Sequence, residues 1–430
     1  MTAIAGQSSQ KSIRSIGVRV VAISALITMV SQFYRNAHVV VAPDIMHDTG
    51  VSAQVLGYLS GALFVTAALM QIPSGILLDR YGPRRTIPFM LSAVLIGSLL
   101  FAAAQDAASL IVARVCMGIG AAGIGMAAIM ASTRWFPSAY FGTVVGIILG
   151  LSYIGNISAT LPMAVVSGWI GWRSSYLAVT VATAALAIAS ALLIRDAPAG
   201  HAFHSRTKES FADAWRGVKE VLAVRELWPL LVIAGTAYAV VSCIIGLWGG
   251  PYLFDIYGLD PAARGSVIIW FPAGMILGNF TITPADRYFD TRKRIIVACG
   301  LAMVALLLML AYAPHLPLVA LTGVLALMGV LSAYTSVIIA HGRCFYPDRL
   351  MGRGMTLVNS AVLIGAGLLQ VLTGALAGIL APAASGLSAD VYSIIFATLA
   401  VALIVALFIY RRCPDVPPSQ GVYARPQSNA

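Results

Sequence analysis

The sequence predicts an all-α membrane protein with twelve transmembrane helices, on the basis of three observations. Hydrophobic residues make up 59% of the chain and charged residues 10%, and the mean hydropathy is +0.89. A soluble domain carries about 25% charged residues, so this composition cannot cover a water-facing surface. The apolar residues gather in stretches of about 20, the length that crosses a bilayer as a helix. Most of the 27 Lys and Arg residues fall between those stretches.

The predicted spans are joined by segments that are rich in charge, Pro or Gly. A helix satisfies the backbone hydrogen bonds within its own segment, which the membrane interior requires. The twelve stretches are 20–42, 54–77, 87–104, 109–131, 142–166, 174–194, 228–250, 265–284, 295–314, 317–340, 355–380 and 391–410.

The basic residues predict the orientation. If the N-terminus is inside, nearly all Lys and Arg lie in cytoplasmic segments, and only Arg173 and Arg264 fall in outer loops. Cytoplasmic loops of membrane proteins carry such an excess of positive charge. We therefore expect both termini to be cytoplasmic. We also expect the charge to face anionic lipid, so that the bilayer is a partner and nucleic acid is not.

Two internal matches predict a repeat of two six-helix halves. Asp79-Arg80-Tyr81 after the second span recurs as Asp286-Arg287-Tyr288 after the eighth, and Arg134-Trp-Phe after the fourth recurs as Arg343-Cys-Phe after the tenth. Transporters built from such repeats bind substrate between them near the midplane. The expected parts are a cytoplasmic tail (1–19), a first bundle (20–194), a cytoplasmic linker with an amphipathic helix (195–227), a second bundle (228–410) and a cytoplasmic tail (411–430).

The loop after the second span resembles the signature of the major facilitator superfamily. The matching residues are Gly75, Asp79, Arg80, Gly82, Arg84 and Arg85, with a second copy at Asp286 and Arg287, and Arg114-Val-Cys-Met-Gly118-Ile-Gly120 and Gly171-Trp172-Arg173 are further elements similar to the family's. The resemblance implies a transporter that works by alternating access, either secondary active or facilitative, and not an enzyme. It also implies that the loop residues form a conformational latch.

The resemblance leaves the substrate open. The antiporter motif of the fifth span is replaced here by Gly155-Asn156-Ile-Ser-Ala-Thr-Leu-Pro162, which disfavours a drug/proton antiporter. A small anionic, carboxylate-like metabolite is the first hypothesis. The alternatives are transport of iron or an iron chelate, as by magnetosome-associated permeases of the superfamily, and a non-cycling transporter-like receptor or assembly protein. The bacterial inner membrane is the expected location, with a specialised intracellular membrane as the alternative.

Two arginines are the only formally charged residues within the predicted spans, and they carry the anion hypothesis. Arg35 and Arg114 are expected about 10 Å and 8 Å below the outer surface, at nearly the same depth. A guanidinium can bind a carboxylate through two parallel hydrogen bonds. The alternative for Arg114 is bonding to backbone carbonyl groups. The other expected substrate-binding residues are Tyr34, Asn36, His38, Tyr238, Ser242 and Tyr334.

Other residues are expected to serve packing. Gly118 and Gly120 on the fourth span, and Gly142, Gly146 and Gly150 on the fifth, would let neighbouring helices approach closely. Several aromatic residues are expected in a belt near the outer interface: Trp169, Trp172, Tyr176, Trp248 and Tyr252. No cysteine, nucleotide or metal motif is present in the sequence, so we expect no cofactor and no metal, and a monomer is the expected state.

Overall fold

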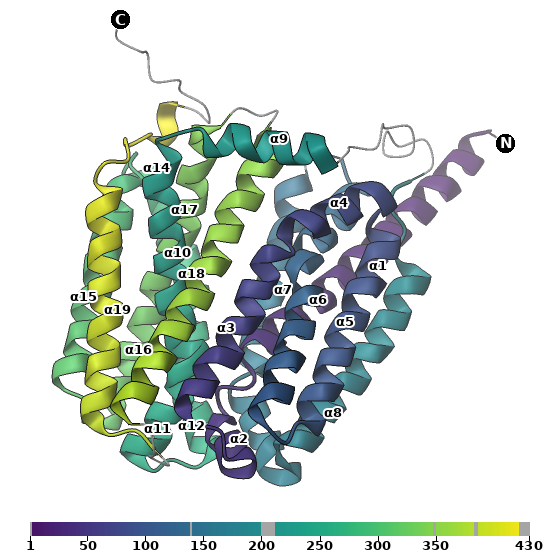
Figure 1. Cartoon of the computed structure of the whole chain (residues 1–430). Helices are drawn as coiled ribbons and strands as arrows, with labels where there is room; N and C mark the ends of the chain where they lie inside the picture. The colour runs from purple at the N-terminus through teal and green to yellow at the C-terminus, as the bar shows by residue number, and fades with distance from the viewer. Residues whose placement is uncertain (1, 138–139, 199–210, 347–349, 382–385, 421–430) are drawn as a thin grey trace, which may run out of the picture.

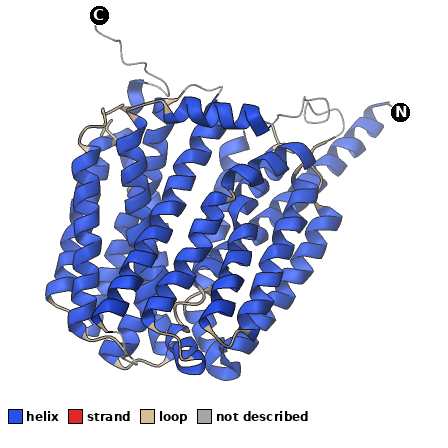
Figure 2. Ribbon diagram, viewed as in Figure 1, coloured by secondary structure: helices blue, strands red, loops and turns tan. Residues whose placement is uncertain are grey.

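The computed structural model describes residues 2–137, 140–198, 211–346, 350–381 and 386–420, and every regular element within these ranges is a helix (Figure 2). The first part of the chain forms α1 (Thr2–Asn36), α2 (Ala42–Thr49), α3 (Ala53–Leu69), α4 (Gln71–Tyr81), α5 (Pro83–Ala103), α6 (Ala107–Thr133), α7 (Phe141–Ser158) and α8 (Leu161–Leu193). The helix of the linker is α9 (Phe211–Leu222).

The second part begins with α10 (Leu227–Cys243), which continues through a π-helical turn, η3 (Ile244–Trp248), into α11 (Gly249–Tyr257). It goes on with α12 (Pro261–Ile268), α13 (Trp270–Thr281), α14 (Ala285–Tyr288), α15 (Lys293–Tyr312), α16 (Leu318–Ser332), α17 (Tyr334–Gly342), the 3₁₀ turn η4 (Arg343–Phe345), α18 (Met351–Leu380), α19 (Ala389–Tyr410) and the 3₁₀ turn η6 (Pro418–Gln420). The predicted all-α membrane fold is confirmed.

Ten helical stretches of the described residues are long and apolar enough to cross a membrane, or eleven if the bent pair α2 and α3 counts as one span. One of the ten runs over 51 residues, from Thr143 to Leu193. A straight helix of that length would measure about 77 Å, far more than the roughly 30 Å of a bilayer core. The stretch is broken at Gly171, whose φ of 78° and ψ of 158° no helix contains. Twelve spans result when this stretch is counted as two crossings and the bent pair α2 and α3 is counted as one.

The helices form two bundles side by side (Figure 1). The bundles meet where α3 packs against α18 and where α12 packs against α8. Helix α1 begins and α19 ends at the face along which α9 lies (Figure 1). The basic loops assign this face to the cytoplasm. The stretch 199–210 of the predicted linker and the end of the tail, 421–430, lie outside the described residues.

The predicted aromatic belt is wrong for four of its five members. Trp172, Tyr176, Trp248 and Tyr252 are all at most 4% exposed, and only Trp169, at 80%, faces outward. The buried rings pack against other rings inside each bundle, for example Tyr176 against Phe101 with 4.6 Å between centroids. Aromatic pairs at such distances stabilise an interior beyond the area that they bury.

The glycines differ from one span to the next. A Cβ at Gly118 would lie 2.6 Å from the carbonyl oxygen of Leu63. A Cβ at Gly120 would collide with the carbonyl oxygen of Met90. The expected close packing at Gly146 and Gly150 is not observed, because a Cβ there would meet nothing within 4 Å. The surroundings of Gly142 lie outside what the structure describes. Close approach on α7 occurs instead at Gly155, which touches the carbonyl group of Met29 on α1.

Candidate functional site

Arg114 is fully buried and its guanidinium bonds to backbone carbonyl groups. Nη1 donates to the carbonyl oxygen of Tyr34 at 2.8 Å and Nε to that of Leu59 at 3.2 Å, and Nη2 lies 3.5 Å from that of Arg35. Two of these acceptors are among the last carbonyls of α1, where the helix dipole leaves partial negative charge. In this conformation Arg114 therefore connects α1 and α3 to α6 through backbone carbonyl groups, as the alternative interpretation of this residue expects.

Arg35 is half-buried and differs from Arg114 in having no partner. Its Nε is buried and no hydrogen-bond acceptor reaches it within the described part of the chain. A guanidinium always carries its charge and its five donors. An uncompensated guanidinium at membrane depth is costly and indicates a wet cavity or a ligand.

Three other residues expected to bind substrate are buried. The Tyr34 hydroxyl lies 3.1 Å from that of Thr183, within the first bundle. His38, in the turn between α1 and α2, is 1% exposed and places Nε2 2.7 Å from the Ser60 hydroxyl. Tyr334 is fully buried, and its hydroxyl has no partner among the described residues. These side chains are held within single bundles rather than between them.

Amide side chains from both bundles meet at the end of α1. Asn36 donates from Nδ2 to Oδ1 of Asn156 on α7 at 2.8 Å. Gln370 on α18 donates from Nε2 to the backbone oxygen of Ser242 on α10 at 3.1 Å. Both amides border Gly246 in η3: a Cβ there would lie 3.2 Å from Asn36 Oδ1 and 3.4 Å from Gln370 Nε2. We call Asn36, Asn156, Gly246 and Gln370 the amide cluster.

Asn156 and Gln370 carry no charge, so the pattern of charged residues in the spans does not identify them. In the sequence each is an uncharged amide within an apolar stretch, which predicts a site less specifically than a charge does. Ser242, expected from the sequence, is 3% exposed and lies at the cluster, but it contributes its backbone oxygen. Tyr238 packs edge-on against Phe64 of the other bundle, with 6.3 Å between ring centroids.

The two bundles are closed against each other on the outer side. Arg264 on α12 forms an ion pair with Asp44 on α2 at 3.1 Å. Gly250 touches the carbonyl group of Val39. At the outer ends of α3 and α18, a Cβ at Gly57 would lie 2.6 Å from Cα of Gly374. The two bundles are in direct contact at these three places.

On the cytoplasmic side a cavity of about 360 Å³ lies between α4 and α18. Asp79 and Gly75 on α4 line it from the first bundle, and Arg353 and Thr356 on α18 line it from the second. Val218 of α9 also lines it. Closed outer contacts combined with a cytoplasmic cavity describe an inward-facing conformation.

The carboxylate of Asp196, in the segment after α8, caps the start of α5. The backbone N–H of Arg84, in the first turn of α5, donates to Oδ1 of Asp196 at 2.8 Å. Gly82 lies directly against that carboxylate and has a φ of 76°, so only glycine fits there without strain. The side chains of Arg80, Arg84 and Arg85 are exposed, as the lipid-facing alternative expects.

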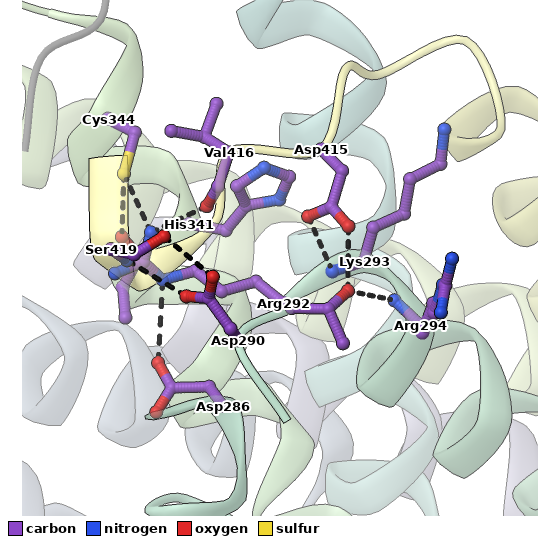
Figure 3. A network of polar contacts seen from close by, with 12 residues as sticks. Asp286, Asp290, Arg292, Lys293, Arg294, His341, Cys344, Asp415, Val416 and Ser419 are labelled. Carbon is purple, nitrogen blue, oxygen red and sulfur yellow. Dashed lines mark hydrogen bonds and ion pairs between the residues drawn. The ribbon is translucent and has the colours of Figure 1, made fainter. Parts of the chain in front are cut away.

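The second copy of the loop repeats this arrangement with the segment after α19 (Figure 3). The N–H of Lys293, in the first turn of α15, donates to Oδ1 of Asp415 at 3.2 Å, and the hydroxyl of Thr291 donates to Oδ2 at 2.6 Å. We call the pairs Arg84–Asp196 and Lys293–Asp415 the two clasps. In each bundle the carboxylate follows the last span and binds the start of the third helix of that bundle.

The rest of the second copy binds the same segment. Asp286 is buried and forms an ion pair with Arg292 at 3.4 Å, while Arg287 is exposed. Arg292 donates to the backbone oxygen of Val416 at 2.7 Å. The hydroxyl of Ser419 donates to Asp290 at 2.6 Å, and this hydrogen bond, with a second from the Ser419 N–H, holds the pKa of the Asp290 carboxyl below its usual value.

In the described ranges, no group of three or more His, Cys, Asp or Glu residues is placed to hold a metal ion. The Arg35 guanidinium and the amide cluster supply hydrogen-bond donors and acceptors at the end of α1.

Comparison with known proteins agrees with this architecture. The chain is 28% identical to the nitrate/nitrite transporter NrtP of Nostoc punctiforme over 44% of this chain and 37% of that protein. It is 24% identical to the probable sulfoacetate transporter SauU of Cupriavidus necator over 51% and 53%. It is 25% identical to the gentisate transporter of Corynebacterium glutamicum over 84% and 80%. The matched region is thus less than two thirds of the first two relatives.

The fold itself matches a solved transporter structure. A bacterial homolog of the human lysosomal transporter Spinster, in an inward-facing and unoccupied conformation, superposes with a TM-score of 0.78 at 20% identity, over 92% of this chain and 96% of that one. The sequence profile of the Major Facilitator Superfamily matches residues 24–369. The chain therefore belongs to the Major Facilitator Superfamily.

Proposed function

We propose that this protein is a secondary transporter that moves a small organic anion across the bacterial inner membrane by alternating access. The observation that carries the proposal is Arg35, a half-buried guanidinium without a partner at the end of α1. The next residue, Asn36, reaches Gly246 of the opposite bundle. A site at this position would be shared by both bundles, as alternating access requires.

The charges of the spans support an anion over a cation. The buried Asp286 and the half-buried Asp255 are already engaged: Asp286 pairs with Arg292, and Asp255 accepts hydrogen bonds from Tyr392 and Leu387. Arg35 is thus a positive charge that no carboxylate of the described residues neutralises. The three relatives described above carry names that refer to anions.

The inward-facing geometry supports a role for the loop of Gly75–Arg85 as a cytoplasmic latch. Asp79 and Arg353 line one cavity from opposite bundles. An acidic and a basic side chain on opposite bundles thus lie at the place where the cytoplasmic side would close. Each bundle is complete within one chain, and we propose that the protein works as a monomer.

Ligand-induced thermal stabilisation of the purified protein tests the proposal. A ligand that binds only the folded state at 100 times its Kd stabilises that state by about 2.7 kcal/mol. The panel contains monocarboxylates, dicarboxylates, nitrate, ferric citrate, sugars and cationic dyes. We expect an anion class to stabilise the parent protein. We expect Arg35→Gln to weaken that binding at least about tenfold, because hydrogen bonds to charged groups are worth about 1.5–3 kcal/mol.

The matched control is Arg412→Gln, which removes an exposed arginine beyond the last helix. This variant should bind as the parent does. Stabilisation by dyes or sugars alone, or equal anion binding by Arg35→Gln and the parent, would contradict the proposal.

A further inference from the structure

The amide cluster contains an acceptor that the protein does not satisfy. Gln370 is fully buried, and its Oε1 has no hydrogen-bond donor within the described residues. The orientation of this amide is fixed, because Nε2 donates to the backbone oxygen of Ser242, and reversing the amide would place two oxygens at 3.1 Å. An unsatisfied buried acceptor costs about 1–3 kcal/mol, so its presence calls for a functional explanation.

A second acceptor lies beside it. Asn36 commits its Nδ2 to Asn156, which leaves Oδ1 directed towards Gly246. No described donor forms a hydrogen bond with this oxygen. Carbonyl oxygens of amides can only accept hydrogen bonds. The buried Oε1 of Gln370 therefore requires a donor that the described residues do not supply, and Oδ1 of the half-buried Asn36 is a second acceptor beside it.

The backbone between them is irregular. Gly246 lies at the centre of η3, and π-helical turns inside α-helices often occur at functional sites. Since Gly246 has no side chain, a small gap remains within 3.4 Å of Asn36 Oδ1 and Gln370 Nε2. Arg35, one residue before Asn36, offers donors only.

We propose that the transported anion also carries a hydroxyl group, which donates its one hydrogen to Oε1 of Gln370 in the amide cluster. This inference rests on the proposed function and narrows its substrate to hydroxy acids. Nitrate and sulfoacetate have no hydroxyl group and would leave Gln370 Oε1 unsatisfied, whereas gentisate carries two hydroxyl groups.

Pairs of acids that differ by one hydroxyl group test the inference. Propionate is compared with lactate, succinate with malate, and benzoate with 3-hydroxybenzoate, and each Kd is measured by thermal-shift titration of the purified protein. For at least one pair, the hydroxylated acid should bind the parent protein about tenfold more tightly or better, because a site built to bond a hydroxyl rejects the analogue that lacks it.

Two variants locate the preference. In Gln370→Met the ratio of the two Kd values should fall to about 1, because the acceptor is removed at similar volume. Gly246→Ala fills the gap and should weaken the hydroxylated acid more than its partner. Gln54→Met, the same substitution in the outer part of α3, should keep the parent ratio and shows whether the loss is specific.

The outcomes separate the two proposals. Equal affinities within every pair, in a protein whose anion binding still requires Arg35, would overturn the hydroxyl inference alone. An unchanged preference in folded Gln370→Met and Gly246→Ala would also overturn it. Absence of any anion binding, or binding that does not depend on Arg35, would overturn the proposed function itself.

Discussion

Arg264 and Asp44 join the two bundles at the outer face, with 3.1 Å between Nη2 and Oδ2. The arginine side chain is 1% exposed and the aspartate side chain 44%. Nε and Nη1 of Arg264 have no hydrogen-bond partner among the described residues, so Asp44 supplies its only described hydrogen bond. Breaking a buried ion pair by removing one partner is strongly destabilising. This pair therefore favours the inward-facing conformation, in which the outer side is closed.

The first prediction concerns this outer contact. The probe is a cysteine that replaces Val39, labelled with a membrane-impermeant maleimide. Asp44→Asn and Arg264→Gln should each raise the rate of this labelling at least about tenfold, which corresponds to roughly 1.4 kcal/mol. The exchanged pair Asp44→Arg with Arg264→Asp should restore protection. Labelling that is as slow in the single variants as in the parent would contradict a closing role.

The second prediction concerns Arg114. Arg114→Met should lower the free energy of unfolding by about 2–5 kcal/mol, because two or three buried carbonyl groups lose their donor. The measurement is thermal unfolding of the purified variant without ligand. Arg35→Gln provides the comparison and should unfold like the parent, since Arg35 has no partner to lose. Similar stability of the two variants would mean that the carbonyl contacts of Arg114 contribute little.

The third prediction compares two glycines on α7. Gly155→Ala should destabilise the protein, because its Cβ would collide with the backbone of Met29. Gly150→Ala should be neutral or stabilising by up to about 1 kcal/mol, since alanine favours a helix and nothing lies within 4 Å. Thermal unfolding of both variants checks this, and a reversed order would refute the packing described for α7.

The fourth prediction concerns pH and the segment after α19. The pKa of Asp290 is lowered by its hydrogen bonds to Ser419. A carboxyl group with a lowered pKa stabilises the bound state above its ordinary pKa of about 3.9, and the effect is lost as the pH falls through the lowered value. A spin label at residue 420 should therefore stay immobile from neutral pH to about 4 and become mobile below it.

Asp290→Asn should make that label mobile at neutral pH as well. Asp106→Asn, at the outer face, is the control and should leave the label unaffected, because Asp106 caps α6 through Ser109. An immobile label in Asp290→Asn would show that the other contacts of this segment are sufficient.

The fifth prediction concerns the cytoplasmic latch. Asp79→Asn should slow transport into proteoliposomes about tenfold or more while leaving ligand affinity in detergent unchanged, because Asp79 lines the cytoplasmic cavity rather than the amide cluster. Transport at the parent rate would remove the latch from the mechanism. Loss of affinity would instead place Asp79 at the substrate site.

The spans and the repeat could be predicted from the sequence because hydropathy and local motifs determine them. The roles of Arg35 and Arg114 could not be separated in that way. Both lie at one depth on neighbouring helices, and only the packing shows that the carbonyls at the end of α1 surround Arg114. Sequence spacing also favoured Gly146 and Gly150 over Gly155, because a regular interval of four says nothing about which face of a helix meets a neighbour.

The two clasps perform the same task in the two bundles. Each binds the segment after the last span to the start of the third helix, over 112 residues in the first bundle and 122 in the second. Neither clasp crosses the interface between the bundles. The bundles can therefore move against each other as units without breaking either clasp.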